Sequence, residues 1–173
     1  MYELSKSHFC LVVQINSKTS KSSLDDLRKT FPKLMIQFVN PDSILNLKHL
    51  LFAIKQSFYA KNNQLLAARD FEVDLLMRIS ITDQIQEALK FSGITPKNQF
   101  YILIAVGNKS NLKLIEKWII DNHDYSSDIV IDNYKNLSKI HKINFNKLNK
   151  LNIELELLSY SAVKLTSKFS DSS

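Results

Sequence analysis

An unbroken apolar run, Phe100–Val106 with the sequence FYILIAV, constrains the fold of this chain more than any other feature. The run is far too short to cross a bilayer. A short continuous run of this kind is typical of a strand that is buried on both faces of a sheet. A second run, Phe9–Ile15, has the same character, and the partly alternating Leu34–Val39 predicts a third strand. The sequence therefore predicts a small central sheet.

Segments with helical periodicity lie between these runs. Ser23 is predicted to cap a short helix over Leu24–Phe31. The clearest helix spans Ile44–Ala60, with Asp42 or Ser43 as its cap. Its apolar stripe has the spacing i, i+3, i+4, i+7, i+11, and consists of Leu47, Leu50, Leu51, Ile54 and Phe58.

The rest of the chain completes a mixed α/β pattern. Ser110 is predicted to cap a further helix, and Ile153–Phe169 fits either a strand or a helix, with a helix from about Glu154 onward favoured by its length. No Pro- or Gly-rich linker divides the chain. We therefore expect a single α/β domain over residues 1–169, with a small central sheet surrounded by helices, and a disordered tail over residues 170–173.

Composition excludes several classes of function. With only two glycines, the chain lacks the glycine-rich loops that hold phosphates in P-loop and Rossmann proteins. Its one cysteine, Cys10, can form neither an internal disulfide nor a cysteine-based metal site. Because no signal peptide is evident, a cytoplasmic location is expected, with the nucleus as an alternative in a eukaryotic source. The net charge of +6 suits a nucleic-acid partner, but the lysines are scattered, and a charge without functional meaning is equally open.

Asp70–Ile94 is predicted to form two short helices that meet at a tight corner, Ser80–Asp83. A hydroxyl of the corner can cap the second helix, and Gly93 is expected to end it in the left-handed conformation. One face of this helix is expected to carry Ile85, Ala88, Leu89 and Ser92. The corner holds Ile81 where a solvated loop would favour a polar residue, so we interpret Ile81 as an exposed apolar residue of a binding surface.

A second line of residues on the helix Ile44–Ala60 combines basic and aromatic side chains. Lys48, Phe52, Lys55 and Tyr59 recur at i, i+4, i+7 and i+11. Such a face can pair with phosphates and stack on bases. In the alternative interpretation, Phe52 packs under a neighbouring helix and the lysines are merely solvated, and the spacing alone slightly favours this alternative.

No catalytic constellation is evident in the sequence. The four histidines (His8, His49, His123 and His141) lack metal-ligand spacing, and His49 is expected to be a core histidine. There is no nucleophile elbow of the G-x-S-x-G type. The chain is therefore predicted not to be an enzyme and to have no metal and no cofactor.

Several short segments follow one another in an order that resembles one known family. They are Asn40-Pro41-x-x-Ile44, His49-Leu50-Leu51-x-Ala53, Glu72/Asp74-Leu75-Leu76, Ser80-x-Thr82-x-Gln84-Ile85-x-x-Ala88 and Gly93-Ile94. This ordered set is similar to the small subunit of the KEOPS complex, the family of the PRPK-binding protein TPRKB and its archaeal relatives. The tail segment Ser161-Ala162-Val163 resembles the last helix of that family.

The resemblance implies a non-catalytic subunit of the complex that makes threonylcarbamoyladenosine (t6A) in tRNA. It implies binding to the kinase-like ATPase subunit through the last helix, which here carries Leu157, Leu158, Ala162, Val163 and Leu165. Archaeal members also hold the single-stranded CCA end of tRNA. We therefore assign RNA binding to the basic-aromatic line and the corner together, at Lys48, Phe52, Lys55, Arg78, Ile81, Thr82, Gln84 and Ile85. Neither a membrane nor a small-molecule substrate is expected.

The sequence departs from the family pattern at the corner, and other functions stay open. Family members often have a glycine and a basic residue where this chain has Ile81 and Asp83, so Arg78, Lys48 and Lys55 are expected to supply the charge. One alternative function is a purely structural adaptor that stabilises or activates the kinase-like subunit without contacting RNA. The other alternative function is an enzyme, for which the isolated chain would show turnover.

Overall fold

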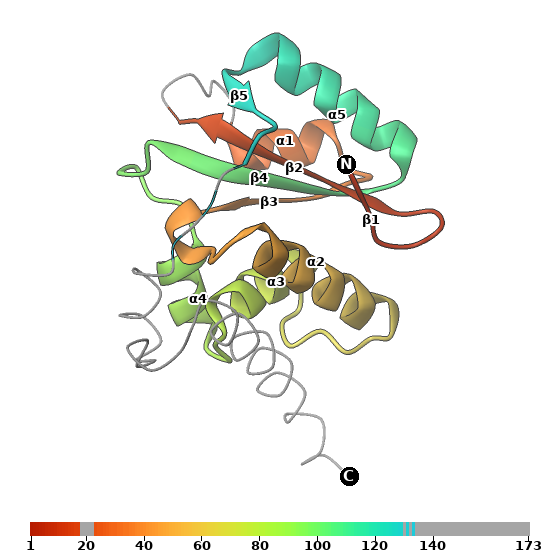
Figure 1. The fold of residues 1–173 in the computed structure, drawn as a ribbon. Coiled ribbons are helices and arrows are strands. Elements are labelled where there is room, and N and C mark those ends of the chain that lie inside the picture. Colours follow the sequence, from red (N-terminus) through yellow and green to blue (C-terminus); the bar gives the residue numbers. More distant parts are fainter. Residues whose placement is uncertain (18–22, 130, 132, 134–173) are drawn as a thin grey trace. The chain divides into compact units, whose positions relative to one another are not determined.

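A computed structural model of the chain describes residues 1–17, 23–129, 131 and 133. These residues form the predicted mixed α/β fold. The strand pairs of their sheet are antiparallel, which the sequence had not indicated. They divide into two compact units, one with Met1–Pro41 and Ile94–Ile129, the other with Asp42–Gly93 (Figure 1). The predicted C-terminal helix and tail lie outside the described residues, and the single domain over residues 1–169 stays a prediction.

Two long antiparallel strands form the centre of the sheet in the first unit. They are β2 (Phe9–Asn16) and β4 (Phe100–Gly107). On its other side β4 pairs antiparallel with β3 (Met35–Val39). All three predicted strands are thereby confirmed. From Tyr101 to Gly107, β4 is buried throughout, as expected of a continuous apolar run in a central strand.

Two short strands complete the free edge of β2. β1 (Tyr2–Glu3) pairs with one end of β2, and β5 (Tyr125–Ser126) pairs with the other end. The strand order is β1-β2-β4-β3, with β5 on the same edge of β2 as β1 (Figure 1). The edge of β2 is therefore covered in two pieces rather than by one strand.

Two helices, α1 (Leu24–Thr30) and α5 (Lys109–Asn122), cover one face of this sheet (Figure 1). Ser23 caps α1 as predicted, in a capping box with Asp26. α5 is capped by Asn108, whose side chain accepts the Asn111 N–H at 2.9 Å, and not by the predicted Ser110. The core beneath them joins side chains from both helices, from three strands and from the loop before β3, namely Leu11, Val13, Ile15, Leu27, Leu34, Ile36, Phe38, Tyr101, Leu103, Ala105, Leu112, Ile115 and Ile119.

The second unit is helical and contains α2 (Leu47–Asn62), α3 (Phe71–Ser80) and α4 (Ile85–Ser92), with α3 in contact with both of the others. α2 begins at Leu47 rather than at the predicted Ile44, because Asn46 has an extended backbone, and a separate 3-10 turn covers Pro41–Ser43. Asn46, rather than Asp42 or Ser43, caps the helix. Within the described ranges, no helix has the length and apolar character that a membrane span requires.

Gly93 ends α4 for a different reason from the predicted one. Its backbone is extended, with φ −69° and ψ 153°, rather than left-handed. Its N–H donates to the Leu89 carbonyl at 3.0 Å, and a Cβ at Gly93 would collide with that same carbonyl oxygen. Close approach of the backbone, and not a positive φ, therefore explains the glycine.

His123 makes the stability of the first unit sensitive to pH. Its ring packs on Trp118 at the end of α5, with ring centroids 4.8 Å apart, and burial lowers the pKa of the imidazole. Because protonation is harder in the folded state than in the unfolded chain, stability falls as pH drops through the unfolded pKa of about 6.5.

We expect the thermal midpoint to fall more for the natural chain than for His123→Asn between about pH 7.5 and about pH 5.5. Asparagine has a similar size and does not titrate, so the difference between the two curves isolates the histidine. Circular-dichroism melts across this range provide the measurement. Parallel pH dependences of the two proteins would contradict the expectation.

Candidate nucleic-acid interface on the helical unit

The basic-aromatic line predicted on α2 lies on the exposed face of that helix. Lys48, Lys55 and Tyr59 are exposed and Phe52 is half-buried, whereas the opposite stripe of Leu50, Ile54 and Phe58 is buried. The two lysines are seven residues apart, or about 10 Å along the helix axis. Two ammonium groups at this separation can reach different phosphates, and the aromatic surface beside them can stack on a base.

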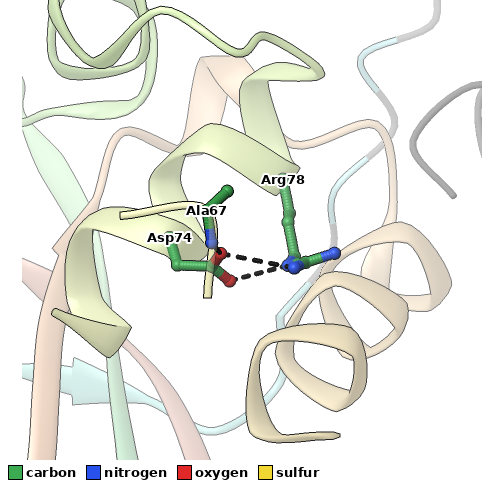
Figure 2. Close-up of polar contacts among 3 residues, drawn as sticks. All are labelled: Ala67, Asp74 and Arg78. Atoms are coloured by element: carbon green, nitrogen blue, oxygen red, sulfur yellow. Dashed lines mark hydrogen bonds and ion pairs between the residues drawn. The ribbon is translucent and has the colours of Figure 1, made fainter. Parts of the chain in front are cut away.

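Arg78 of α3 forms a buried ion pair instead of facing solvent. Its Nε donates to Asp74 Oδ2 at 2.7 Å, and its Nη2 donates to Asp74 Oδ1 at 3.3 Å. The Ala67 N–H also donates to Asp74 Oδ1, at 2.8 Å (Figure 2). The side chain of Arg78 is 5% exposed and that of Asp74 is 0% exposed. This carboxylate therefore ties the loop before α3 to the middle of the helix.

The burial of Arg78 corrects the expectation that it supplies charge at the corner. A residue in the last turn of an amphipathic helix can be predicted to be solvated, but Asp74 lies one turn earlier on the same face, and the two neutralise each other inside the unit. A phosphate at the surface would have to compete with this pair for the guanidinium.

Ile81 is buried at 5% exposure, which corrects its interpretation as an exposed apolar residue. It is the C-cap of α3 in the left-handed conformation, with φ 51° and ψ 46°. The N–H groups of Ile81 and Thr82 donate to the carbonyls of Arg78 and Met77, at 3.3 and 3.1 Å. A β-branched residue is strained there, and burial of its side chain offsets that cost.

The hydroxyl groups of the corner are used within the protein. The Thr82 Oγ1 donates to Glu87 Oε2 at 2.9 Å and accepts the Gln84 N–H at 3.2 Å. Ser80 and Ser92 share a buried hydrogen bond of 2.6 Å that joins α3 to α4. Gln84 is itself the N-cap of α4, so neither Ser80 nor Thr82 is the cap that the sequence suggested. The hydroxyl groups of Ser80 and Thr82 therefore hold the corner against α4.

The part of the corner that faces solvent is acidic and partly apolar. Gln84 and Ile85 are exposed, as a ligand-binding role requires. They line a shallow hollow of ≈ 710 Å³ with Asp83, Gln86 and Glu87. With two carboxyl groups in its lining, this hollow repels phosphates rather than attracting them. Any contact of the corner with RNA therefore has to be through bases or through neutral groups.

The sequence did not predict that Leu89 joins Ile85 as an exposed apolar pair on α4. The four residues predicted to share one face separate into two sets, because Ala88 and Ser92 are buried while Ile85 and Leu89 are 45% and 48% exposed. Small side chains at positions 88 and 92 let α4 approach α3 closely, which turns the larger neighbours outward. Small residues spaced i, i+4 inside an apolar helix pattern are the signal that could have revealed this packing.

Among the residues that the structure describes, no group of three His, Cys, Asp or Glu side chains is placed to hold a metal ion. His49 is buried as predicted, and its Nδ1 accepts the Leu45 N–H at 3.2 Å. The exposed features of the helical unit are thus a basic-aromatic face on α2 and an apolar pair on α4. Both are surfaces suited to binding large partners.

Comparison with known proteins also indicates a protein that binds a large partner. The family model described as kinase binding protein CGI-121 matches residues 13–167. The match covers well over half of the chain, and the chain therefore belongs to this family of kinase-binding proteins. The resemblance to the small KEOPS subunit, drawn from the sequence, is thereby confirmed. No curated protein matches the chain in sequence.

Removal of the buried guanidinium tests the structural role of Arg78. Arg78→Met leaves Asp74 as an unpaired buried carboxylate, and we expect a loss of about 3–5 kcal/mol in the free energy of unfolding. The matched control is Arg69→Met, at an exposed position just before α3, for which we expect a change within about 0.5 kcal/mol. Urea denaturation followed by circular dichroism measures both. Equal effects of the two substitutions would contradict the buried pair.

Proposed function

We propose that the chain is a non-catalytic subunit of the KEOPS complex for t6A modification, which binds the kinase-like ATPase subunit and the single-stranded CCA end of tRNA. Membership of a kinase-binding family is the observation that carries the first half of this proposal. The exposed basic-aromatic face of α2 supports the second half. The chain would then act in the cytoplasm, or in the nucleus in a eukaryotic source.

The structure revises which residues are suited to touch RNA. Lys48 and Lys55 can pair with phosphates, and Phe52 offers a partly exposed ring for stacking. Gln84 and Ile85 extend the surface at the corner with an amide and an apolar group. We propose that Arg78, Ile81 and Thr82 have a positioning role behind this surface, because all three are buried.

For the kinase-like subunit we propose docking on the C-terminal segment, at Leu157, Leu158, Ala162, Val163 and Leu165, which lie outside the described residues. Apolar side chains in a protein interface contribute about 25 cal/mol per Å² of surface removed from water, before the costs of association. The exposed pair Ile85 and Leu89 is a second apolar surface on the chain, and the docking experiment must separate the two.

Filter binding with intact tRNA and with tRNA that lacks the CCA end tests RNA recognition directly. We expect tighter retention of the intact tRNA, because unpaired bases that stack on aromatic side chains contribute about 1–3 kcal/mol each. Equal retention of the two RNAs would exclude recognition of the CCA end. Retention of neither would favour the purely structural adaptor.

A charge reversal on α2 tests the proposed phosphate contacts. In Lys48→Glu/Lys55→Glu we expect weaker tRNA binding and a plot of log K against log [salt] that is shallower by about 1.4, since each lost contact to a single strand removes about 0.7. The matched control is Lys113→Glu/Lys117→Glu, which makes the same charge change on exposed positions of α5. An equal loss in both variants would mean that only the net charge matters.

A charge in the C-terminal segment tests the kinase interface. Val163→Glu should abolish co-purification with the kinase-like subunit, because a carboxylate would be buried against an apolar partner, while the circular-dichroism spectrum stays unchanged. Ser161→Glu adds the same charge at a polar position outside the proposed apolar set, so it is the control and should retain binding. If Val163→Glu binds normally and Leu89→Glu does not, the interface lies on α4.

A further inference from the structure

The exposed face of α5 carries two large apolar side chains. Leu114 is 60% exposed and Ile120 is 53% exposed. Leu114 also borders a hollow of ≈ 260 Å³, which is lined by α5 and by Thr30–Leu34, the segment that leads from the end of α1 to β3. Asn111 lines the hollow one turn before Leu114, whereas Ile120 is not part of the lining. The hollow belongs to the first unit and shares no element with the surfaces of α2 and α4.

The segment on one side of the hollow is fixed by its own contacts. The Phe31 N–H donates to the Leu27 carbonyl at 2.8 Å, and the Leu34 N–H donates to the Phe31 carbonyl at 3.0 Å. The rings of Phe31 and Trp118 meet edge to face, with centroids 6.1 Å apart and an interplanar angle of 75°. The ring of Pro32 fixes its own φ. The hollow is therefore formed before a ligand arrives, which lowers the ordering cost of binding.

The lining of the hollow favours one aromatic side chain. Its apolar members are Phe31, Pro32, Leu34 and Leu114. The Thr30 hydroxyl group donates to the Asp26 carbonyl at 2.8 Å, and Asn111 contributes an amide that can accept an indole N–H or a phenol O–H. An enclosed cavity of about 150 Å³ holds one benzene ring, so this more open hollow has room for one aromatic side chain.

Exposed lysines accompany the hollow on both elements that line it. Lys33 is part of the lining, and Lys29 lies in the last turn of α1. On α5, Lys113 is next to Leu114 in the sequence, and Lys117 lies three residues beyond Leu114 on the same side of the helix. All four lysines are exposed. Their ammonium groups favour a ligand with negative charges beside its aromatic ring.

None of the carboxyl groups of α1 and α5 lines the hollow. Asp25 and Asp26 lie in the first turn of α1, where the Asp26 carboxyl group completes the capping box. Asp121 is seven residues beyond Leu114, or about 10 Å along the axis of α5. Glu116 is two residues from Leu114, and this spacing turns it to the opposite side of the helix. The immediate surroundings of the hollow are therefore basic.

We propose that the hollow binds an acidic segment of another protein. The segment inserts one aromatic side chain beside Leu114 and places its carboxylates near Lys33, Lys113 and Lys117. Apolar contact in the hollow provides the anchor, and the lysines select a segment of opposite charge. The proposal goes beyond the proposed function, because it uses none of the residues assigned there to RNA or to the kinase-like subunit.

A peptide fits the hollow better than a single-stranded RNA does, although both can carry negative charge. Unpaired bases bind by stacking on open aromatic faces. The aromatic ring of the lining, Phe31, is half-buried and packs against Trp118. A base inside the hollow would also turn its polar edge toward apolar side chains, which costs free energy unless hydrogen bonds replace the lost water.

A capped pentapeptide with a central tryptophan and two glutamates on each side is the probe. In ¹H–¹⁵N spectra of the full chain we expect it to shift the amides of Asn111 and Leu114 saturably. One control peptide has alanine in place of the tryptophan, and the other has glutamine in place of every glutamate. Each control should bind about tenfold more weakly at low salt, because it lacks either the buried ring or the charges.

Leu114→Glu should weaken binding of the tryptophan peptide by about tenfold or more, since it replaces an apolar wall with a like charge. Ile120→Glu makes the same change on the same helix outside the hollow and should leave binding unchanged. Both positions are exposed, so both variants are expected to fold. Neither substitution should change the binding of tRNA.

Equal affinity for the tryptophan and alanine peptides would overturn the proposal, since the hollow would then hold no aromatic anchor. This comparison uses the natural chain and does not depend on how a variant folds. Unchanged amides of Asn111 and Leu114 at millimolar peptide would overturn it too. Displacement of the peptide from these amides by oligoadenosine would also contradict it, because the occupant would then be a nucleic acid.

Discussion

The ion pair between Asp74 and Arg78 is the interaction on which the helical unit depends most. It places two charges in a region with almost no solvent contact, and the same carboxylate holds the Ala67 N–H (Figure 2). Breaking such a pair from one side costs several kcal/mol because the remaining charge is buried without a partner. The pair also removes a guanidinium from the surface of the corner. The exposed cations that could pair with phosphates are therefore the lysines of α2.

The corner between α3 and α4 is a structural element with a limited exposed rim. Ile81 is held in a left-handed conformation under its own buried side chain, and Thr82 bridges to Glu87. Buried groups of this kind fix the geometry of the corner and offer little surface to a partner. The exposed rim at Gln84 and Ile85 is flanked by carboxyl groups, so its part in an RNA complex would be to hold a base and not a phosphate.

The sequence was most informative where one local pattern decided the structure. The unbroken apolar runs predicted β2 and β4, and the helical periodicity of residues 44–60 predicted the two faces of α2. It was least informative where a tertiary contact decides. Burial of Ile81 is not visible in the local sequence. Asp74 does lie one turn before Arg78, but the spacing does not show that this pair is buried. Gly93 is required by a close carbonyl rather than by its φ.

Photo-crosslinking of tRNA to the chain, followed by mass spectrometry of the linked peptides, shows directly whether RNA binds the exposed face of α2. We expect crosslinks within the segment that holds Lys48, Phe52 and Lys55, and their loss when the CCA end is removed. Crosslinks confined to the acidic rim at residues 83–87, with none on α2, would contradict this binding surface.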